Sequence, residues 1–259
     1  MVGMRILANV VILLALVACD KNTSPVGPST SFSESVMSEA LSSASTGIQQ
    51  SASTRGLPFR RILCFGDSIT YGATSSTLDG LTSLSIVEGY VSKLRRRLTR
   101  EYGAGMELIN SGAPAEDTSD GLRRLDSELH RYRPDLVLLL EGVIDVNNPY
   151  PQLNQARDNL SKMMKMTLHE GAACIIGTYV PLNRQGFRVR GAKNVTELNR
   201  VIRIEAAKQS VPVADHEEAS ERDMSLQGPD GLHPNDNGYR LMADTWFQAT
   251  LDLVAELET

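Results

Sequence analysis

Leu136-Val137-Leu138-Leu139-Leu140 is apolar at every position, and this run decides the fold class. A strand with one buried face alternates apolar and polar side chains, whereas a continuous Leu/Val run is typical of a strand covered on both faces. Four further stretches are predicted as strands: Arg61–Phe65, Met106–Asn110, Ala172–Val180 and Val211–Ala214. Together these segments predict a five-stranded sheet.

Amphipathic stretches separate these strands and are predicted as helices: Val87–Tyr102, Asp117–Tyr132, Gln152–Leu168, Val195–Ser210 and Gly238–Leu257. Buried strands that alternate with helices indicate an α/β fold, in which a parallel sheet has helices on both faces. Ligands of such open sheets bind beyond the carboxyl ends of the strands. Ser68, Ala115 and Asp145 follow the first three strands, so we expect their loops to share one edge.

The first 18 residues predict an export signal, separate from the fold. Arg5 gives a basic start, and the apolar segment Ile6–Val17 is too short to span a bilayer comfortably. Leu16-Val17-Ala18-Cys19 resembles the lipobox of bacterial lipoproteins, which implies cleavage before Cys19 and attachment of lipid to its sulfur. An ordinary cleaved signal with an incidental cysteine is the alternative. The lipoprotein interpretation predicts a protein of the cell envelope, anchored to a membrane through Cys19.

A linker and a single domain are predicted after this signal. Residues 19–57 are rich in Ser and Thr and nearly lack aromatic side chains. Such a segment cannot bury enough apolar surface to offset its ordering entropy, so we expect a mobile tether. Residues 58–259 suffice for one domain with a substantial core. The predicted boundaries are therefore 1–18, 19–57 and 58–259.

Charge and cysteine content narrow the class of function. A formal net charge of −5 over 259 residues argues against a general nucleic-acid binder. The most basic segment, Lys93–Arg100, is interpreted as a solvated helix face, with contact to anionic lipid headgroups as the alternative. Cys64 and Cys174 lie inside apolar runs, where cysteine behaves as a small buried hydrophobe. Two unpaired core thiols are therefore expected.

Two short segments at opposite ends of the domain carry the chemistry. Gly66-Asp67-Ser68-Ile69-Thr70 places a serine directly after the first strand, and Asp230-Gly231-Leu232-His233 places an aspartate three residues before a histidine. A serine hydroxyl becomes a nucleophile when a base takes its proton, and a third group orients that base. Each segment alone is ordinary turn chemistry. Their joint occurrence predicts a serine hydrolase.

These segments make the chain resemble the SGNH, or GDSL, hydrolases over its whole folded part. Residues 66–70 are similar to the first sequence block of that family and residues 230–234 to its last block. Residues 110–118 are similar to the second block, and Gly142-Val143-Ile144-Asp145 stands where the family carries Gly-x-Asn-Asp. The resemblance implies a three-layer, flavodoxin-like arrangement of the predicted sheet and helices.

The resemblance also implies a role for each site residue. Ser68 would be the nucleophile, His233 the general base and Asp230 the group that orients the base. The family's oxyanion hole has three donors: the backbone N–H of the nucleophile, a backbone N–H in the second block and the side-chain amide of the third-block asparagine. In this chain the second of these donors would come from Ala115.

Two of the three oxyanion donors depart from the family's pattern. Ala115 stands where glycine is usual, and its methyl group would add strain of about 1 kcal/mol if the backbone needs a positive φ. Ile144 occupies the asparagine position and has no donor. Loss of one such donor typically costs roughly 10²–10³ in rate. Asn147 or Asn148 could act as a substitute, or could belong to a plain loop.

Two functions follow from this pattern. The first is a serine esterase, weakened at Ile144, that cleaves carboxylic or thio esters of short to medium acyl chains; the second is a degenerate domain that binds envelope lipid or glycan. The resemblance implies acyl esters, lysophospholipids or acylated glycans as substrates. Pro181–Lys193 is predicted to overhang the site, where Arg184, Arg188 and Arg190 would meet an anionic substrate or merely solvate the loop.

The sequence predicts no cofactor and no metal. It contains no P-loop, no dinucleotide-binding glycine fingerprint and no zinc-ligand spacing. Asp215-His216-Glu217-Glu218 has metal-ligating side chains, but adjacent residues of one loop seldom converge on an ion without distant partners.

Overall fold

Five parallel strands form the central sheet of the computed structural model, which describes residues 56–259 except 79–80 and 87. The strands run in the order β4-β1-β5-β6-β7. Their bounds are Arg61–Gly66 for β1, Glu107–Gly112 for β4, Leu136–Leu140 for β5, Ala173–Gly177 for β6 and Val213–Ala214 for β7. This is the flavodoxin-like order: β4, the second strand of this sheet along the chain, lies at the edge next to β1, and the later strands follow on the other side of β1. The predicted signal (1–18), Cys19 and residues 19–55 of the predicted linker lie outside the described residues.

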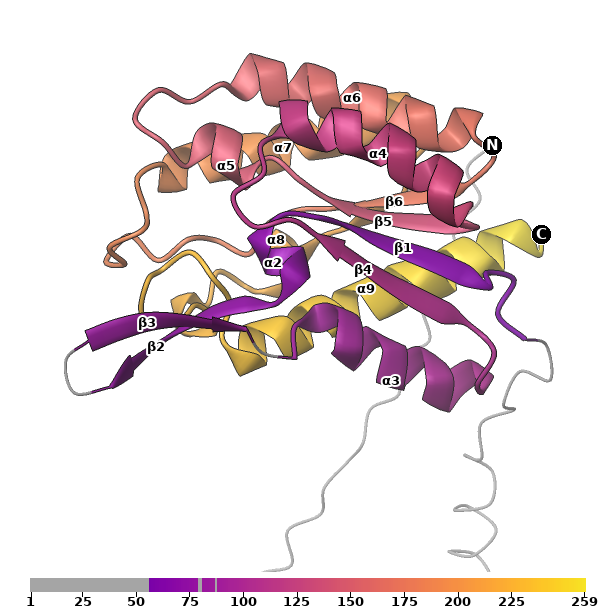
Figure 1. The fold of residues 1–259 in the computed structure, drawn as a ribbon, viewed down its shortest axis with the longest axis horizontal. Coiled ribbons are helices and arrows are strands. Elements are labelled where there is room, and N and C mark those ends of the chain that lie inside the picture. The colour runs from indigo at the N-terminus through magenta and orange to yellow at the C-terminus, as the bar shows by residue number, and fades with distance from the viewer. Residues whose placement is uncertain (1–55, 79–80, 87) are drawn as a thin grey trace, which may run out of the picture. The chain divides into compact units, whose positions relative to one another are not determined.

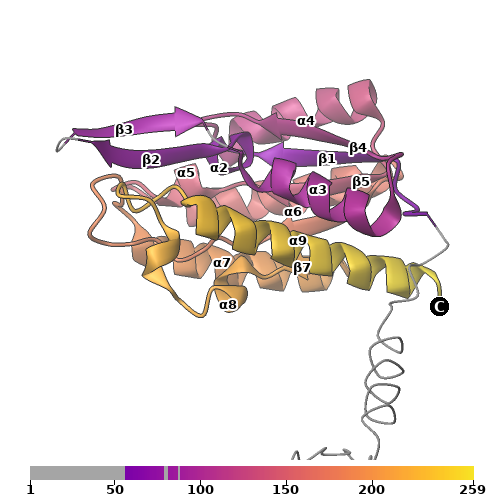
Figure 2. The same cartoon turned by 90° about the horizontal axis from the view of Figure 1, so that it is seen from below.

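Helices cover both faces of this sheet (Figure 1). One face carries α4 (Thr118–Tyr132), α6 (Leu153–His169) and α7 (Ala192–Lys208). The other carries α3 (Tyr90–Tyr102) and α9 (Asp236–Leu257), which lie side by side in Figure 2. The predicted α/β class with three layers is confirmed. Among the described helices, none combines the length and apolarity needed to cross a bilayer.

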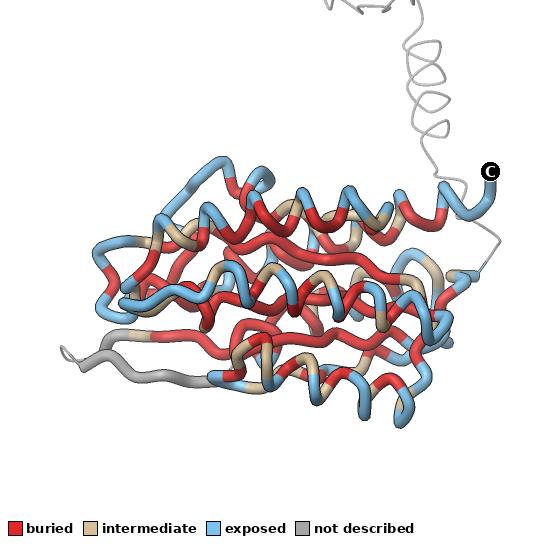
Figure 3. Tube along the Cα trace, turned by 90° about the horizontal axis from the view of Figure 1, so that it is seen from above, coloured by how far each residue is buried: buried red, intermediate tan, exposed pale blue. Residues whose placement is uncertain are grey.

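The core lies between the sheet and its two helical layers. Every residue of β5 is buried, as the continuous Leu/Val run predicts, and the strands are buried along most of their length in Figure 3. Trp246 of α9 is fully buried and its ring lies 5.9 Å from that of Tyr90 on α3. Cys64 of β1 and Cys174 of β6 are both buried and unpaired. Burial raises the pKa of each thiol to about 12, so neither is reactive near neutral pH.

The apolar runs overestimate the length of two strands. Strand β6 ends at Gly177 instead of Val180, although residues 178–180 are also buried. Tyr179 leaves the sheet because its backbone exchanges hydrogen bonds of 2.8 and 2.9 Å with the amide of Asn199 on α7. Strand β7 has only two residues, since Val213–Ala214 alone pairs with β6. Burial by itself therefore does not identify a strand.

Several short elements are absent from the sequence prediction. An antiparallel hairpin, β2 (Ala73–Leu78) with β3 (Leu81–Ile86), projects from the body at the edge where the strands end (Figure 2). Single-turn helices follow three of the sheet strands: α2 (Ser68–Tyr71), α5 (Val143–Val146) and α8 (His216–Ala219). A 3₁₀ turn, η1 (Met224–Leu226), precedes the last sequence block. The hairpin is rich in Ser and Thr, so it lacks the apolar pattern by which the other strands are recognised.

Candidate active site

Ser68 is held at the carboxyl end of β1 by the tight junction between β1 and α2. A Cβ at Gly66 would lie 2.3 Å from both the Leu140 carbonyl oxygen and Thr70 Oγ1, so only glycine fits there. Asp67 caps α2 by accepting a 2.7 Å hydrogen bond from the Ile69 N–H. Ser68 is then the first residue of the helix and is 7% exposed. The hydroxyl is thus fixed at the edge where ligands of such sheets bind.

The structure brings the two distant motifs into direct contact. Ser68 Oγ lies 3.0 Å from His233 Nε2, and His233 Nδ1 lies 2.6 Å from Asp230 Oδ2. The other carboxylate oxygen of Asp230 accepts the backbone N–H groups of Leu232 and His233, both at 3.0 Å. The three predicted residues therefore form a hydrogen-bonded chain from serine through histidine to aspartate.

The charge of Asp230 decides which nitrogen of His233 carries the proton. Burial acts to raise the pKa of Asp230, but its hydrogen bonds with the His233 side chain and with the backbone of His233 and Leu232 outweigh burial and hold the pKa at about 2. An ionised carboxylate only accepts hydrogen bonds, so Nδ1 must be the protonated nitrogen of a neutral imidazole. Nε2 is then free to accept the Ser68 proton, as a general base requires.

Strand β2 supports the catalytic loop in a way that the sequence motifs do not indicate. Ser75 Oγ accepts a 3.0 Å hydrogen bond from the Asp230 N–H, and Thr74 Oγ1 donates to the Pro234 carbonyl at 2.9 Å. Both side chains are buried. Asp79-Gly80 is a hairpin-turn signal in the sequence that could have revealed this hairpin. The contacts to the loop depend on packing between residues more than 150 positions apart.

The two backbone N–H groups predicted as oxyanion donors, those of Ser68 and Ala115, have no hydrogen-bond partner among the described residues. As the first residue of a helix, Ser68 has no intrahelical partner for its N–H. Ala115 lies in a turn closed by a 3.3 Å hydrogen bond from the Glu116 N–H to the Ala113 carbonyl. Its φ is 65°, the left-handed conformation that glycine favours at the third position of a type II turn, after a proline such as Pro114. No hydrogen bond among the described residues uses the Ala115 N–H.

Ile144 occupies the predicted third-donor position and supplies no donor. It is the second residue of α5, half-buried against the core. Asp145 beside it accepts 2.9 and 2.7 Å hydrogen bonds from the backbone and hydroxyl of Thr118, which tie α5 to the start of α4. The third block therefore carries an apolar, half-buried side chain at the position predicted for the third donor.

The two nearby asparagine amides are engaged elsewhere. Asn147 donates to the Arg188 carbonyl at 2.9 Å and accepts from the N–H groups of Arg190 and Gly191 at 2.8 and 2.9 Å. Asn148 donates to the Asp145 carbonyl at 2.8 Å. Neither is free to replace the lost donor, because moving it would break these bonds to the backbone.

The segment predicted to overhang the site, Pro181–Lys193, packs directly on the loop that carries the triad histidine. Arg188 donates its backbone N–H to the Asp230 carbonyl at 3.1 Å, and its Nε lies 3.7 Å from Asp230 Oδ2. A cleft of about 720 Å³ also runs along this segment, with Arg184, Lys193 and Arg222 in its wall. The triad does not line this cleft. Among the arginines of this segment, Arg188 is the one that contacts a triad residue, Asp230.

Asp67, which precedes Ser68, and Glu141, whose charge interacts with that of Asp67, are both buried carboxyl groups. Burial raises the pKa of Asp67 to about 6, although its hydrogen bonds from Ile69 and from the Tyr179 hydroxyl at 2.8 Å oppose the shift. Burial, followed by the charges of Asp67 and Glu116, raises the pKa of Glu141 well above its ordinary value. Burial therefore favours the uncharged form of Glu141.

His216 is a core residue with no metal-like surroundings. It is fully buried, its ring lies edge-on to Trp246 at 5.0 Å, and burial lowers its pKa to about 3. Its neighbours Asp215 and Glu217 both bind Arg203, at 2.6 and 2.8 Å. Within the part of the chain that the structure describes, no three His, Cys, Asp or Glu side chains gather as a metal site would require.

Comparison with known proteins identifies similar sequences and folds. Residues 64–241 match the model of the GDSL-like lipase/acylhydrolase family. An arylesterase of Vibrio mimicus is 29% identical over 116 residues, which make up 45% of this chain and 52% of that protein. The match thus spans about half the length of this relative.

Solved structures extend the likeness to nearly the whole described fold. A lipase/acylhydrolase from Enterococcus faecalis is 28% identical with a TM-score of 0.62, and the match covers 73% of this chain and 94% of that one. The aryl esterase of M. smegmatis is 24% identical with a TM-score of 0.65, over 75% of this chain and 99% of that one. A carbohydrate acetylesterase from Sinorhizobium meliloti is 20% identical with a TM-score of 0.63, over 76% and 99% of the two chains. The last two show a shared fold.

Proposed function

Because this chain belongs to the GDSL-like lipase/acylhydrolase family, we propose that it is a serine esterase that hydrolyses carboxylic esters through an acyl-enzyme. The observation that carries the proposal is the contact of Ser68 Oγ with His233 Nε2 at 3.0 Å, together with that of His233 Nδ1 and Asp230 at 2.6 Å. A nucleophile, its base and the group that orients the base are thereby in hydrogen-bond reach of one another.

The reaction follows from these positions in two halves. Ser68 Oγ attacks the ester carbonyl carbon while its proton passes to His233 Nε2, and a tetrahedral oxyanion forms. The C–O bond to the alcohol then breaks, and His233 returns the proton to the leaving oxygen. Water then loses a proton to His233 as its oxygen attacks the acyl carbon. The bond from that carbon to Ser68 Oγ breaks, the acid leaves, and His233 returns the proton to Ser68 Oγ.

The oxyanion is stabilised by two backbone N–H groups, those of Ser68 and Ala115. An enzyme with a third donor would stabilise the same charge by about 3–4 kcal/mol more. We therefore expect slow turnover relative to family members that keep the asparagine at the position of Ile144. The nucleophile, its base and the orienting carboxylate are all in place. The lower rate is expected because fewer donors stabilise the negative charge that develops on the carbonyl oxygen.

The proposed substrates are esters, or thioesters, of short to medium acyl chains. The arylesterase, aryl esterase and acetylesterase names of the similar proteins support small acyl groups and varied leaving groups. An anchor at Cys19 would place the enzyme at the cell envelope, where lysophospholipids and acylated glycans are available. This location rests on the sequence of the first 19 residues alone.

Ile144 also supports the second function, an inactive domain that binds envelope lipid or glycan. The two are separated by measuring hydrolysis of p-nitrophenyl esters from C2 to C16 with the purified protein, with Ser68→Ala as the test variant. Ser92→Ala on the partly exposed side of α3 is the matched control. If the protein is an esterase, the wild type should hydrolyse these esters, Ser68→Ala should abolish the hydrolysis, and Ser92→Ala should retain it.

A fluorophosphonate probe gives an independent reading of the same serine. It bonds covalently to a serine oxygen that a neighbouring base activates. The esterase predicts labelling of the protein that Ser68→Ala removes. A folded protein that neither turns over any of the esters nor reacts with the probe would support the binding domain instead.

A further inference from the structure

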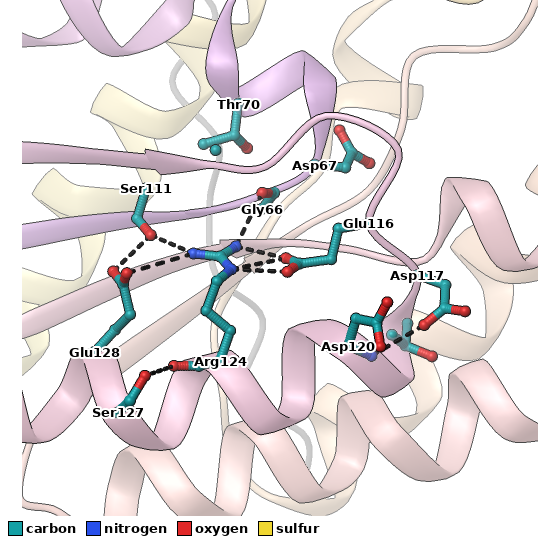
Figure 4. Close-up of polar contacts among 12 residues, drawn as sticks. Gly66, Asp67, Thr70, Ser111, Glu116, Asp117, Asp120, Arg124, Ser127 and Glu128 are labelled. Atoms are coloured by element: carbon teal, nitrogen blue, oxygen red, sulfur yellow. Dashed lines mark hydrogen bonds and ion pairs between the residues drawn. The ribbon is translucent and has the colours of Figure 1, made fainter.

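Arg124 of α4 points its guanidinium at Gly66, Ser111 and Glu116, which lie close in the sequence to Ser68 and Ala115 (Figure 4). Its Nε donates to both carboxylate oxygens of Glu116, at 3.0 and 2.8 Å, and its Nη2 to one of them at 2.5 Å. The same Nη2 donates to the Gly66 carbonyl oxygen at 3.3 Å. Nη1 donates to Ser111 Oγ at 2.5 Å. One guanidinium thus contacts three separate chain segments.

These contacts fall beside the two donor groups in the sequence. Gly66 precedes Ser68 by two residues at the end of β1, and Glu116 directly follows Ala115. Ser111 lies near the end of β4, where the chain enters the Ala115 turn. A shift of the guanidinium would therefore move both donor N–H groups relative to each other.

The surroundings of Arg124 make this connection stiff. The guanidinium lies 3.9 Å above the Phe65 ring, and the side chains of Arg124 and Glu116 are only 23% and 8% exposed. Burial disfavours the charged guanidinium, but the hydrogen bonds and charge of Glu116 outweigh burial and raise the pKa of Arg124. Charge-assisted, multiply bonded arginine–carboxylate pairs fix geometry as well as supply energy.

The conformation of Ala115 makes such an anchor necessary. A left-handed backbone at a residue with a Cβ costs about 1 kcal/mol or more, and it persists only where the surroundings impose it. The Ala115 turn is exposed on its other side, since Pro114 and Ala115 both face solvent. Glu116, held by Arg124, is the buried residue that fixes the turn from within. Without it the turn could relax and rotate the Ala115 N–H away from the oxyanion.

We propose that Arg124 is a positioning residue that aligns the backbone N–H groups of Ser68 and Ala115 on the oxyanion. The inference rests on the proposed esterase function. The proposal gives a residue of α4 a role in stabilising the transition state, although α4 lies outside the sequence motifs that carry the catalytic residues. Because Ile144 offers no third donor, this alignment carries the whole of the oxyanion stabilisation in this chain.

Comparing an ester with its thionoester, in which sulfur replaces the carbonyl oxygen, tests the role directly. Sulfur accepts hydrogen bonds weakly, so the oxyanion hole accelerates thionoester cleavage much less than ester cleavage. The ratio of the two kcat/KM values cancels the concentration of active enzyme. Partial unfolding of a variant therefore cannot change this ratio, whereas misplaced donors must lower it.

The variants are Arg124→Lys, which loses the planar fork, and Glu116→Gln, which keeps size and loses charge. We expect each to lower kcat for the ester about 10-fold or more with little change in KM, because small displacements of catalytic groups have effects of that order. The ester-to-thionoester ratio should fall by a similar factor. Arg203→Lys is the matched control, because Arg203 is likewise held by carboxylates, those of Asp215 and Glu217, and does not contact the triad. Its ratio should equal that of the wild type.

The possible failures are distinguishable. A wild type without Ser68-dependent turnover of either substrate would overturn the esterase function and, with it, the role of Arg124. Wild-type turnover with an unchanged ratio in both Arg124→Lys and Glu116→Gln would overturn only the positioning role. A fall in ratio of the same size in Arg203→Lys would also overturn it.

Discussion

Thr118 donates two hydrogen bonds to the carboxylate of Asp145, from its backbone N–H at 2.9 Å and from Oγ1 at 2.7 Å. This pair joins the first turn of α4 to α5. It therefore fixes Ile144, the residue before Asp145, where the family carries its donor amide. At that position this chain has an isoleucine, whose side chain is half-buried against the core.

Ile144→Asn should raise kcat for ester hydrolysis. An amide in that place adds a third donor to the oxyanion hole, and one such donor is worth roughly 10²–10³ in rate when well aligned. We expect a gain of about 10-fold or more, measured by steady-state kinetics on a p-nitrophenyl ester. Ile144→Val is the control, because it changes size without adding a donor. Equal kcat for Ile144→Asn and the wild type would contradict the assignment of this position.

Substitutions at Ala115 should separate backbone strain from side-chain size. Ala115→Gly removes the Cβ strain at φ 65° but adds unfolded-state entropy, so the free energy of unfolding should change by less than about 1 kcal/mol. Ala115→Val places a β-branched residue at positive φ and should lower both stability and kcat. Urea unfolding and ester kinetics check the two effects. A fully stable, fully active Ala115→Val protein would show that the turn does not need this conformation.

Asp230→Asn should lower kcat by about 10³–10⁴ while the fold stays intact. An amide at residue 230 can donate to Nδ1, which places the His233 proton on Nε2, where it blocks acceptance from Ser68. The contribution of Asp230 to stability is present above its unfolded pKa and lost as pH falls through its folded value of about 2. Ester kinetics at neutral pH give the main reading. Near-wild-type kcat in Asp230→Asn would remove Asp230 from the mechanism.

His216 should make the protein sensitive to acid. Its folded pKa of about 3 lies below the ordinary value of 6.5, so between those pH values the unfolded chain binds a proton that the folded one does not. The contribution of His216 to the free energy of unfolding is fully present above pH 6.5. It declines as pH falls, by at most about 1.4 kcal/mol per pH unit. His216→Leu should flatten this decline in urea titrations from pH 7 to 4. Exposed His169→Leu is the control; an unchanged pH profile in His216→Leu would contradict the prediction.

Asp67 should act on stability in the opposite direction. Its pKa rises from 3.8 to about 6 on folding, mainly through burial, so the folded protein takes up a proton as pH falls through that window. Its carboxylate therefore costs stability above pH 6, and the cost disappears toward pH 4. Asp67→Asn should be more stable than the wild type at pH 7.5, by up to about 3 kcal/mol. The difference should vanish near pH 4; a difference independent of pH would refute this origin.

Local sequence pattern accounts for the sheet, the main helices and the choice of Ser68, His233 and Asp230 as the proposed reacting residues. The run Leu136–Leu140 predicts a strand buried on both faces, because burial imposes apolar side chains at every position of such a strand. The same pattern overestimates β6, because residues 178–180 are buried without pairing as a strand. Ser68 and His233 stand out because catalysis demands these side chains in short, recognisable motifs. The export signal and the lipid anchor at Cys19 stay predictions of the sequence.

Tertiary structure alone decided how the site is held together. Ser75 on the hairpin meets Asp230 across 155 positions, and Arg124 on α4 joins Gly66 to Glu116. Neither contact has a local signature, because a helix period or a strand alternation reports burial and not partners. The proposed nucleophile and its base could be predicted from short sequence motifs. The alignment of the oxyanion donors depends on which distant side chains the packed fold brings beside them.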